Sequence, residues 1–212
     1  MTLPIDILEH EFVLHCSGSM FWPQKSILFI SDVHLGKVMH FRKYGVAIPP
    51  SSVTGNFKQL TKVVQHFEPK HIIFLGDLFH SELNIEWNNF EDWTKTIDAK
   101  IILVAGNHDI ISPTKYYDIN VEVVSEICIE QFLLTHHPEE RQGFFNFCGH
   151  IHPGIRLRGL GRQFLNLPCF FRKPFQLILP AFGEFTGKYI LKPEGDDLVY
   201  AITKEDVILV KK

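Results

Sequence analysis

The stretch FISDVHLGK, residues 29–37, joins an apolar run to an aspartate and a histidine that are two positions apart. Residues i and i+2 of a strand point to the same face, so a strand that continues through Ser31 would direct Asp32 and His34 toward one spot just beyond the sheet. A carboxylate and an imidazole at one spot are typical of a metal site. A single Asp-x-His pair has little specificity, so the prediction depends on further ligands elsewhere in the chain.

Four more apolar runs end in polar clusters in the same way. Asp77 follows HIIFL; Asn107, His108 and Asp109 follow IILVA; His136 and His137 follow QFLLT; His150 and His152 follow FNFC. Open α/β sheets bind ligands outside the carboxyl ends of their strands, so clusters from distant parts of the chain can meet in one crevice. The sequence therefore predicts one site built from five strand ends.

The number and type of these side chains indicate two metal ions. The candidate ligands, all oxygen or imidazole donors, are Asp32, His34, Asp77, Asn107, His136, His150 and His152. This set exceeds what one ion needs, whereas two divalent ions that share a bridging carboxylate would use all of it. Two ions roughly 3.5–4 Å apart activate water and hold the oxygens of an in-line displacement, as in phosphoryl transfer. These donors favour manganese, iron or zinc over a thiolate zinc site, and manganese is our first expectation.

The segments around the motifs predict strands that alternate with helices, followed by a series of strands. EFVLHC and SILFI are predicted strands, and SGSMFWPQK between them is interpreted as a hairpin or a loose connection. Helical spacing from Val53 to Phe67 predicts a helix with its N-cap at Ser51 or Ser52, and a second helix is expected near IEWNNFEDWTKTID. After Val121 the strand-like runs are VEVV, ICIEQFLLT, FNFC, QFLNLPCFF, FQLILPAF and KYILK, and LVYAITKEDVILVKK is a predicted hairpin.

Length and composition indicate a globular protein outside the membrane. The 212 residues fit one domain, expected over residues 1–212, with 45% hydrophobic and 21% charged residues. No apolar run approaches the roughly 20 residues of a membrane span, and the acidic start MTLPIDILEHEF does not fit a signal peptide. The four cysteines are widely separated and form no C-x-x-C pair, so we expect reduced thiols and a cytoplasmic location.

Basic residues gather in two segments although the net charge is -3. Residues 33–67 contain lysine and arginine but no aspartate or glutamate, and residues 141–192 contain Glu184 as their one acidic residue. A local basic field beside a site can steer a ligand that carries phosphate. The expected phosphate contacts are Lys37, Arg42, Arg156, Arg158 and Arg162, with an ordinary solvated surface as the alternative.

The motifs SDVH, GDLFH, GNHD, a strand-end His136 and GHIH, in this order, resemble those of the calcineurin-like metallophosphoesterases. The resemblance covers nearly the whole chain. It implies an α/β (α+β) fold, a four-layer sandwich of two mixed β-sheets flanked by helices, with a dinuclear site at its edge. The implied ligands of the first metal are Asp32, His34, Asp77 and His152, and those of the second are Asp77, Asn107, His136 and His150.

The same resemblance implies the catalytic roles. A metal-bridging hydroxide would attack phosphorus in line, and His108 would face the substrate. His108 is then expected to protonate the leaving oxygen as a general acid, with Asp109 as an orienting partner. His80 in GDLFH is a further candidate for lining the site.

A closer resemblance lies between the motifs. DVHLGKVMHFRKYGVAIPP, GDLFHS, GHIHP and LILPAFGEFTGK are similar to the bacterial ligase-associated DNA damage response endonucleases, the PdeM family. This resemblance implies a phosphodiesterase that acts on DNA in repair and whose operon encodes a DNA ligase and a helicase as potential partners. One departure is THHPEE, in which His137 follows the expected ligand His136. Adjacent strand residues point in opposite directions, so we expect His136 to bind metal and His137 to contact substrate or support the site.

Two alternatives stay open. The enzyme could act on a cyclic nucleotide or another small phosphodiester; the lipid-precursor hydrolases of the superfamily are less favoured, since they carry arginine at the position of His108. A non-catalytic scaffold with the same fold is the alternative from another class. Such scaffolds typically lose ligands, whereas every ligand position is filled in this chain.

Overall fold

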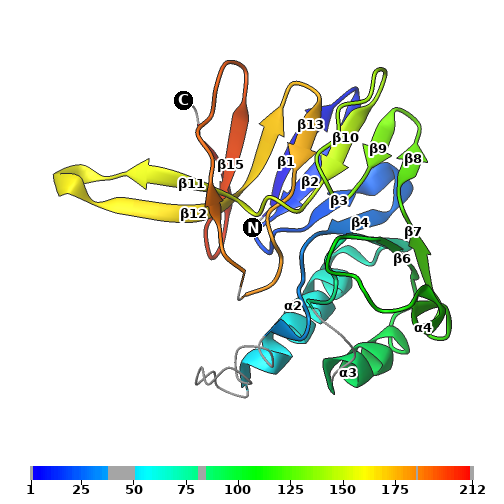
Figure 1. The fold of residues 1–212 in the computed structure, drawn as a ribbon. Helices are drawn as coiled ribbons and strands as arrows, with labels where there is room; N and C mark the ends of the chain where they lie inside the picture. Colours follow the sequence, from blue (N-terminus) through cyan, green and yellow to red (C-terminus); the bar gives the residue numbers. More distant parts are fainter. Residues whose placement is uncertain (1, 38–50, 81–84, 185, 211–212) are drawn as a thin grey trace.

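The computed structural model of the chain describes residues 2–37, 51–80, 85–184 and 186–210. Two mixed β-sheets pack face to face, and the helices lie against the outer face of one of them (Figure 1). This arrangement confirms the predicted mixed α/β class with two mixed sheets.

The first sheet has seven strands in chain order, from β1 to β7. They are β1 (Thr2–Ile7), β2 (His10–His15), β3 (Met20–Trp22), β4 (Ile27–Ile30), β5 (His71–Leu75), β6 (Lys100–Val104) and β7 (Val121–Val124). Strands β1 to β4 are antiparallel neighbours, whereas β4 to β7 are parallel. Parallel strands are covered on both faces and read as continuous apolar runs, and all four residues of β4 are buried.

Helices connect the parallel strands of the first sheet and cover its outer face. The helices are α2 (Ser51–Phe67), α3 (Ile85–Thr94), α4 (Pro113–Tyr117) and the short 3-10 turns η1 (Pro23–Lys25) and η2 (Leu160–Arg162). Leu60 and Val63 of α2 and Phe90 of α3 are buried in one cluster with the outward-facing residues of β4 and β5. Within the described part of the chain, no helix is long and apolar enough to span a membrane.

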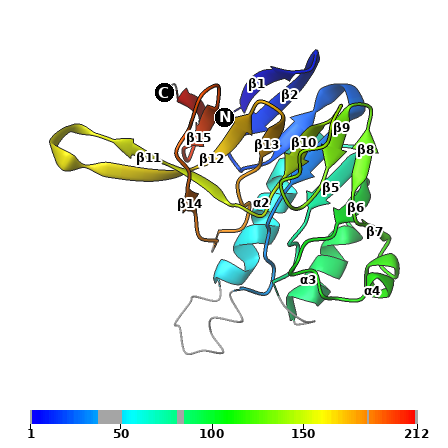
Figure 2. The same ribbon diagram turned by 45° about the horizontal axis from the view of Figure 1, so that its top comes forward.

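The second sheet is formed by the C-terminal half of the chain. Its strands are β8 (Ile127–Ile129), β9 (Phe132–Leu134), β10 (Phe145–Cys148), β11 (Pro153–Arg158), β12 (Phe164–Lys173), β13 (Gln176–Ile178), β14 (Tyr189–Ile190), β15 (Leu198–Ile202) and β16 (Val207–Val210). Strands β9, β10 and β13 run parallel, and β11 and β12 form an antiparallel hairpin. This hairpin, called the arm below, projects far from the body of the molecule, as Figures 1 and 2 show in yellow.

Phenylalanine fills the space between the two sheets. Phe12 and Phe29 from the first sheet and Phe132, Phe147 and Phe170 from the second are buried in one cluster. The ring centroids of Phe132 and Phe147 are 5.1 Å apart in a stacked arrangement. Each buried ring contributes roughly 1.5–3 kcal/mol relative to an exposed one, so this core fixes how the two sheets face each other.

Several elements differ from those that the sequence predicts. ICIEQFLLT is not one strand, because the chain turns at Glu130, whose φ is 55°, and forms the antiparallel pair β8 and β9. The strands β1 and β11 and the helix α4 were not predicted, and β3 lies inside the segment interpreted as a hairpin or a loose connection. The side chains of Ser51 and Ser52 lie outside the described residues.

Candidate metal centre

The five predicted strand ends meet at one place, although they belong to two sheets. Strands β4, β5 and β6 come from the first sheet, and β9 and β10 come from the second. The backbone N–H of His150 donates to Oδ2 of Asp32, at 3.0 Å, and so links the loop after β10 to the loop after β4. The site is therefore assembled across the edge of the sandwich.

The local geometry at Asp32 differs from our expectation. Strand β4 ends at Ile30, and both Asp32 (φ 53°) and His34 (φ 51°) have left-handed backbone conformations. The same holds for Asp77 (φ 51°), His150 (φ 67°) and His152 (φ 51°). Left-handed non-glycine residues cost of order 1–3 kcal/mol each and concentrate at functional sites. Strained turns, rather than strand alternation, therefore direct these side chains to one point.

The first candidate ligand group consists of Asp32, His34, Asp77 and His152. Nε2 of His152 lies 3.1 Å from Oδ1 of Asp32 and 3.2 Å from Nε2 of His34. Nε2 of His34 lies 3.9 Å from Oδ2 of Asp77. These spacings leave the donor atoms around one small volume, as a metal ion would require.

The second candidate ligand group consists of Asp77, Asn107, His136 and His150. Nε2 of His136 lies 3.4 Å from Oδ1 of Asp77 and 3.2 Å from Oδ1 of Asn107. Nδ1 of His150 lies 3.2 Å from Nε2 of His136. The two oxygens of Asp77 thus face different groups, which is the arrangement of a bridging carboxylate.

The hydrogen bonds at Asp32 and His136 test whether these residues fit metal ions. Oδ2 of Asp32 accepts from the Ser31 hydroxyl at 2.5 Å, whereas its buried Oδ1 accepts no well-directed hydrogen bond from the described residues and faces Nε2 of His152 at 3.1 Å. An unpartnered buried carboxylate oxygen is costly unless a cation compensates it. Nδ1–H of His136 donates to the Leu75 carbonyl at 2.9 Å, which leaves the lone pair of Nε2 facing the site. Both arrangements fit divalent cations.

The protonation states also suit metal binding. Burial lowers the pKa of His34 to about 3, so its imidazole is neutral near pH 7. Burial alone would raise the pKa of Asp32, but its hydrogen bonds and the charge of His152 outweigh this and hold the pKa below its usual range. A neutral imidazole and an ionised carboxylate are the ligand forms.

Two glycines let the ligand loops approach each other closely. A Cβ at Gly76, whose φ is 81°, would overlap the imidazole of His136. A Cβ at Gly149 would overlap the Ser31 hydroxyl and lie 2.5 Å from Oδ2 of Asp32. The glycines of GD and GH are therefore needed for the contact between strand ends.

Asp109 ties together the loops that follow β5 and β6. Its carboxylate accepts four backbone N–H hydrogen bonds, from Asp77 (2.8 Å), Leu78 (3.0 Å), Phe79 (3.2 Å) and Gly106 (2.8 Å). Burial raises the pKa of Asp109 to about 6 despite these bonds. The backbone N–H of His108 donates to Oδ1 of Asp77 at 2.9 Å. The loop that carries Asn107 and His108 is thus held against Asp77.

His80 and His108 lie beside the first ligand group. The ring centroid of His34 is 5.4 Å from that of His80 and 5.7 Å from that of His108, and the latter two are 4.9 Å apart. His137 is exposed, with its ring 4.1 Å from that of His150 and 4.8 Å from that of His136. With those two residues it forms another group whose candidate ligand atoms lie within 4.8 Å of one another.

Of the described basic residues predicted to contact phosphate, only Lys37 is found close to the candidate metal ligands. Lys37 is half-buried, and the charges of Asp32 and Asp77 act on it, although burial lowers its pKa overall. Arg156, Arg158 and Arg162 are exposed on the arm. Arg42 lies outside the described residues.

Sequence reasoning missed Ser31 and Lys188. Ser31 is fully buried and holds Asp32, and its place directly before the motif aspartate was an available signal. Lys188 lies beside His152, because the backbone N–H of the next residue, Tyr189, donates to the His152 carbonyl at 2.9 Å. A single lysine in a basic segment gives no such signal in the sequence.

A buried two-part donor site at the edge of two mixed sheets is the arrangement expected of a metallophosphoesterase. The chain matches the family model of the calcineurin-like phosphoesterases over residues 25–169, and it belongs to this family. Because it belongs to this family, the protein is a hydrolytic enzyme that acts on phosphoesters. The family uses divalent metal ions, and the chain has candidate residues to bind them.

Among solved structures, the crystal structure of the Pseudomonas putida nuclease MPE is similar over 99% of this chain and 100% of that chain, with a TM-score of 0.82 and 27% identity. A protein of unknown function from Aquifex aeolicus, AQ665, is 19% identical over 59% of this chain and 78% of its own, and its TM-score of 0.42 supports no argument. No curated protein matches the chain.

Proposed function

We propose that the protein is a phosphodiesterase that depends on two divalent metal ions and cleaves DNA. The observation that carries the proposal is the position of Asp77, whose two carboxylate oxygens face two different sets of donors. Two bound ions would activate water for attack on phosphorus and stabilise the negative charge that develops there. Complete ligand groups argue against a non-catalytic scaffold.

In this proposal each ligand group holds one ion, with Asp77 shared. His136, rather than His137, belongs to the second group because its side chain is buried and its Nδ1–H is fixed on the Leu75 carbonyl. His137 is exposed and would contact the substrate beside His150. The imidazole of His108 would give a proton to the leaving oxygen, and Asp109 would hold the loop of His108 through its four backbone contacts.

Nucleic acid is the proposed substrate for two reasons. The similar Pseudomonas putida protein is a nuclease. On this chain, Arg156 and Arg158 lie on an arm that begins one residue after His152, so the arm starts at the metal centre. At about 3.3 Å per strand residue, Arg156 is ~13 Å along the chain from His152, a reach that suits a neighbouring phosphate. Lys37 and His80 would contact the phosphate group at the site itself, as would Arg42.

Other features stay predictions. Manganese as the native metal, a role in DNA repair, and contact with a ligase or a helicase rest on the resemblance to the PdeM family. A cytoplasmic location is supported by the four cysteines, which are all unpaired. A single domain over residues 1–212 is supported by the site itself, because strands of both sheets lead into it.

Hydrolysis of a panel of esters tests the proposed function. With manganese, we expect turnover of bis(p-nitrophenyl) phosphate and of DNA and much weaker turnover of p-nitrophenyl phosphate and a cyclic nucleotide. The variant His108→Ala should lower kcat on DNA by about 10²–10⁴-fold, the usual contribution of a general acid, with less effect on p-nitrophenolate release, which needs no proton. Absence of any activity above a chelated control would contradict the enzyme assignment, and turnover of the cyclic nucleotide without DNA cleavage would contradict DNA as substrate.

Removal of the two arm arginines tests DNA binding separately from chemistry. The variant Arg156→Ala/Arg158→Ala should weaken DNA binding roughly tenfold and reduce the slope of log affinity against log salt by about 2, since each lost phosphate contact removes about one unit. The rate of bis(p-nitrophenyl) phosphate hydrolysis should stay within twofold of the wild-type rate, because this small ester is too short to reach the arm. Exposed lysines outside the arm allow the matched control Lys70→Ala/Lys115→Ala. An equal loss of DNA affinity in both double variants would show that overall charge, and not the arm, is responsible.

A further inference from the structure

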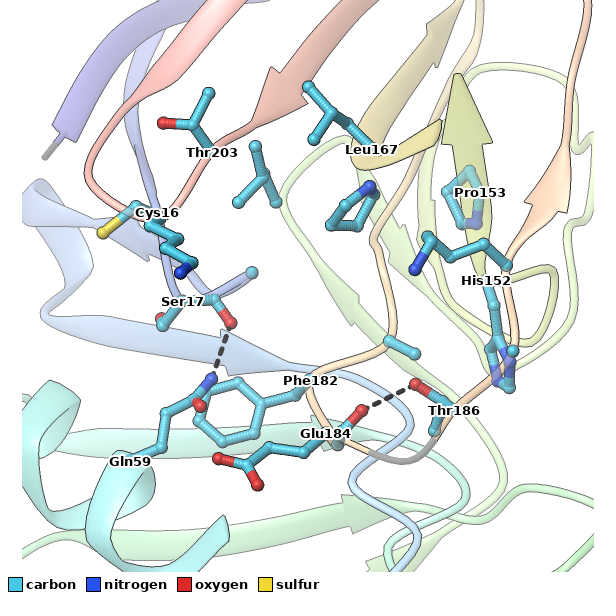
Figure 3. A pocket seen from close by; sticks show the side chains of 18 residues that line it. Cys16, Ser17, Gln59, His152, Pro153, Leu167, Phe182, Glu184, Thr186 and Thr203 are labelled. Atoms are coloured by element: carbon cyan, nitrogen blue, oxygen red, sulfur yellow. Dashed lines mark hydrogen bonds between the residues drawn. The ribbon is translucent and has the colours of Figure 1, made fainter. Parts of the chain in front are cut away.

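A cavity of about 340 Å³ lies beside the metal centre, and His152 forms part of its wall (Figure 3). Six segments far apart in the sequence enclose it. The first two are the turn after β2, with Cys16 and Ser17, and helix α2, with Gln59. Two more form the base of the arm, one at Pro153 and the other at Leu167. The last two are residues 181–184 with 186–188, and the turn after β15 with Thr203 and Lys204. Because His152 belongs to the first candidate ligand group, the cavity borders the site.

The walls of the cavity differ in character. Pro153, Leu167, Pro168, Phe182 and Ile202 provide apolar surface. Lys188 and Lys204 provide positive charge, and neither has an ion-pair partner within the part of the chain that the structure describes. The volume is at the lower end of the range of about 300–1,000 Å³ typical of ligand pockets. A ligand of this size with an apolar ring and negative charge at its ends fits such walls.

Lys188 is fixed in its place beside the metal centre. Strand β14 pairs with the start of β11, where Tyr189 lies opposite Pro153. A Cβ at Gly154 would lie 3.0 Å from Cβ of Lys188, so the lysine side chain leaves the backbone directly beside the arm. The backbone therefore holds the start of this basic side chain at a constant position relative to His152.

The carboxylate in the cavity does not neutralise these lysines. Glu184 is turned toward the start of α2, where a Cβ at Gly55 would lie 2.6 Å from its Oε2. Its backbone N–H donates to Oδ1 of Asn56 at 3.2 Å, and the Thr186 hydroxyl donates to the Gly183 carbonyl, which keeps this segment folded against the helix. The lysines thus remain available to an anionic ligand.

We propose that this cavity binds the nucleoside on one side of the scissile phosphate, and that Lys188 and Lys204 contact the phosphate beyond it. The inference rests on the proposed function and specifies where its substrate lies. A phosphodiester has two organic substituents, and one held at His152 must place one of them toward the cavity. The next part of the strand would then pass Leu167 and Pro168 and follow the arm toward Arg156.

Esters with a common leaving group test the cavity. The probes are bis(p-nitrophenyl) phosphate and the p-nitrophenyl esters of thymidine 5′-phosphate and thymidine 3′-phosphate, each thymidine ester with and without a second terminal phosphate. One thymidine ester should have a KM at least about tenfold below that of bis(p-nitrophenyl) phosphate, from burial of the nucleoside, and the second phosphate should lower it further. The cavity-filling variant Ala181→Leu should raise the KM of the preferred ester about tenfold and so remove most of its advantage over bis(p-nitrophenyl) phosphate.

The lysine variant supplies a second measurement that does not depend on packing. Lys188→Ala/Lys204→Ala should abolish the advantage of the second phosphate, whereas the exposed pair Lys70→Ala/Lys115→Ala should preserve it. Thermal melting checks that Ala181→Leu is folded. If bis(p-nitrophenyl) phosphate is hydrolysed but neither thymidine ester has a lower KM, or if both lysine pairs act alike, the cavity proposal is overturned while the proposed function stands. Failure to hydrolyse any of the esters would instead contradict the proposed function.

Discussion

The variant Asp77→Asn is expected to lower kcat/KM for bis(p-nitrophenyl) phosphate by at least about 10³-fold, which corresponds to roughly 4 kcal/mol of transition-state stabilisation. The reason is geometric, because Oδ2 of Asp77 faces His34 and Oδ1 faces His136. Asparagine has the same size but replaces one oxygen by an amide N–H₂, which cannot bind a metal ion. One ligand group would lose a donor, and the charge shared between the groups would disappear.

Metal content gives an independent measurement for Asp77→Asn. After dialysis against manganese, we expect about two ions per wild-type chain and one or none per variant chain, since a bridging ligand serves both sites. An exposed aspartate distant from the ligand loops allows the matched control Asp98→Asn, which should keep both ions and full activity. A variant that retains two ions and more than a tenth of the wild-type activity would contradict the bridging role.

The candidate ligands could be proposed from the sequence because each polar cluster directly follows a buried run. All five strands before these clusters, which end at Ile30, Leu75, Val104, Leu134 and Cys148, contribute at least two fully or nearly fully buried apolar residues to the core. A buried strand has a fixed end, and a motif that follows it has little freedom. The sequence alone was therefore enough to predict that the five motifs lie close together.

The backbone conformation of the ligands could not be predicted in this way. Strand alternation suggested that Asp32 and His34 share one face, yet both residues are left-handed and β4 has already ended. Neither residue type favours that conformation strongly enough to reveal it. It is imposed by contacts between the two sheets, such as the hydrogen bond from the His150 backbone to Asp32. Pairing over more than a hundred residues leaves no local signal.

The first strand of the arm, β11, was missed for a different reason. Ile155 and Leu157 alternate with Arg156 and Arg158, but the strand begins with Pro153 and Gly154, which weaken a strand prediction. Much of the arm is exposed on both faces; Leu160 is 93% exposed and Phe164 is 61% exposed. Without a buried face, the pattern that identifies strands is largely absent.

The segment LILPAFGEFTGK acquires a physical role in the structure. It contributed to the resemblance to the PdeM family without an assigned function, and its residues 181–184 and 186–188 form one wall of the cavity beside His152. Gly183 approaches the first motif so closely that a Cβ would overlap the Val33 carbonyl. The segment thus connects the ligand loop after β4 with the proposed nucleoside site.

The variant Gly149→Ala is expected to destabilise the protein by about 2–3 kcal/mol and to reduce activity at least about 100-fold, because overpacking of a rigid site shifts its side chains. The added Cβ would overlap the Ser31 hydroxyl and lie 2.5 Å from Oδ2 of Asp32. Neither neighbour can move freely, since both are fully buried and Ser31 is bonded to Asp32 and to the Leu75 carbonyl. Urea unfolding and kcat/KM for bis(p-nitrophenyl) phosphate measure the two effects.

Two further variants separate this collision from a general effect of alanine. Gly159→Ala adds the same methyl group at a φ of -92°, where the nearest atom is 3.6 Å away, so stability and activity should change little. Ser31→Ala removes the overlapping oxygen, and the double variant Ser31→Ala/Gly149→Ala should therefore be more stable than the sum of the single effects predicts, by about 1 kcal/mol. Activity should remain low in the double variant, because Asp32 loses the hydroxyl that holds its Oδ2. Strict additivity in the unfolding experiment would show that the Gly149 methyl group does not meet Ser31, and that the approach of β10 to β4 has another cause.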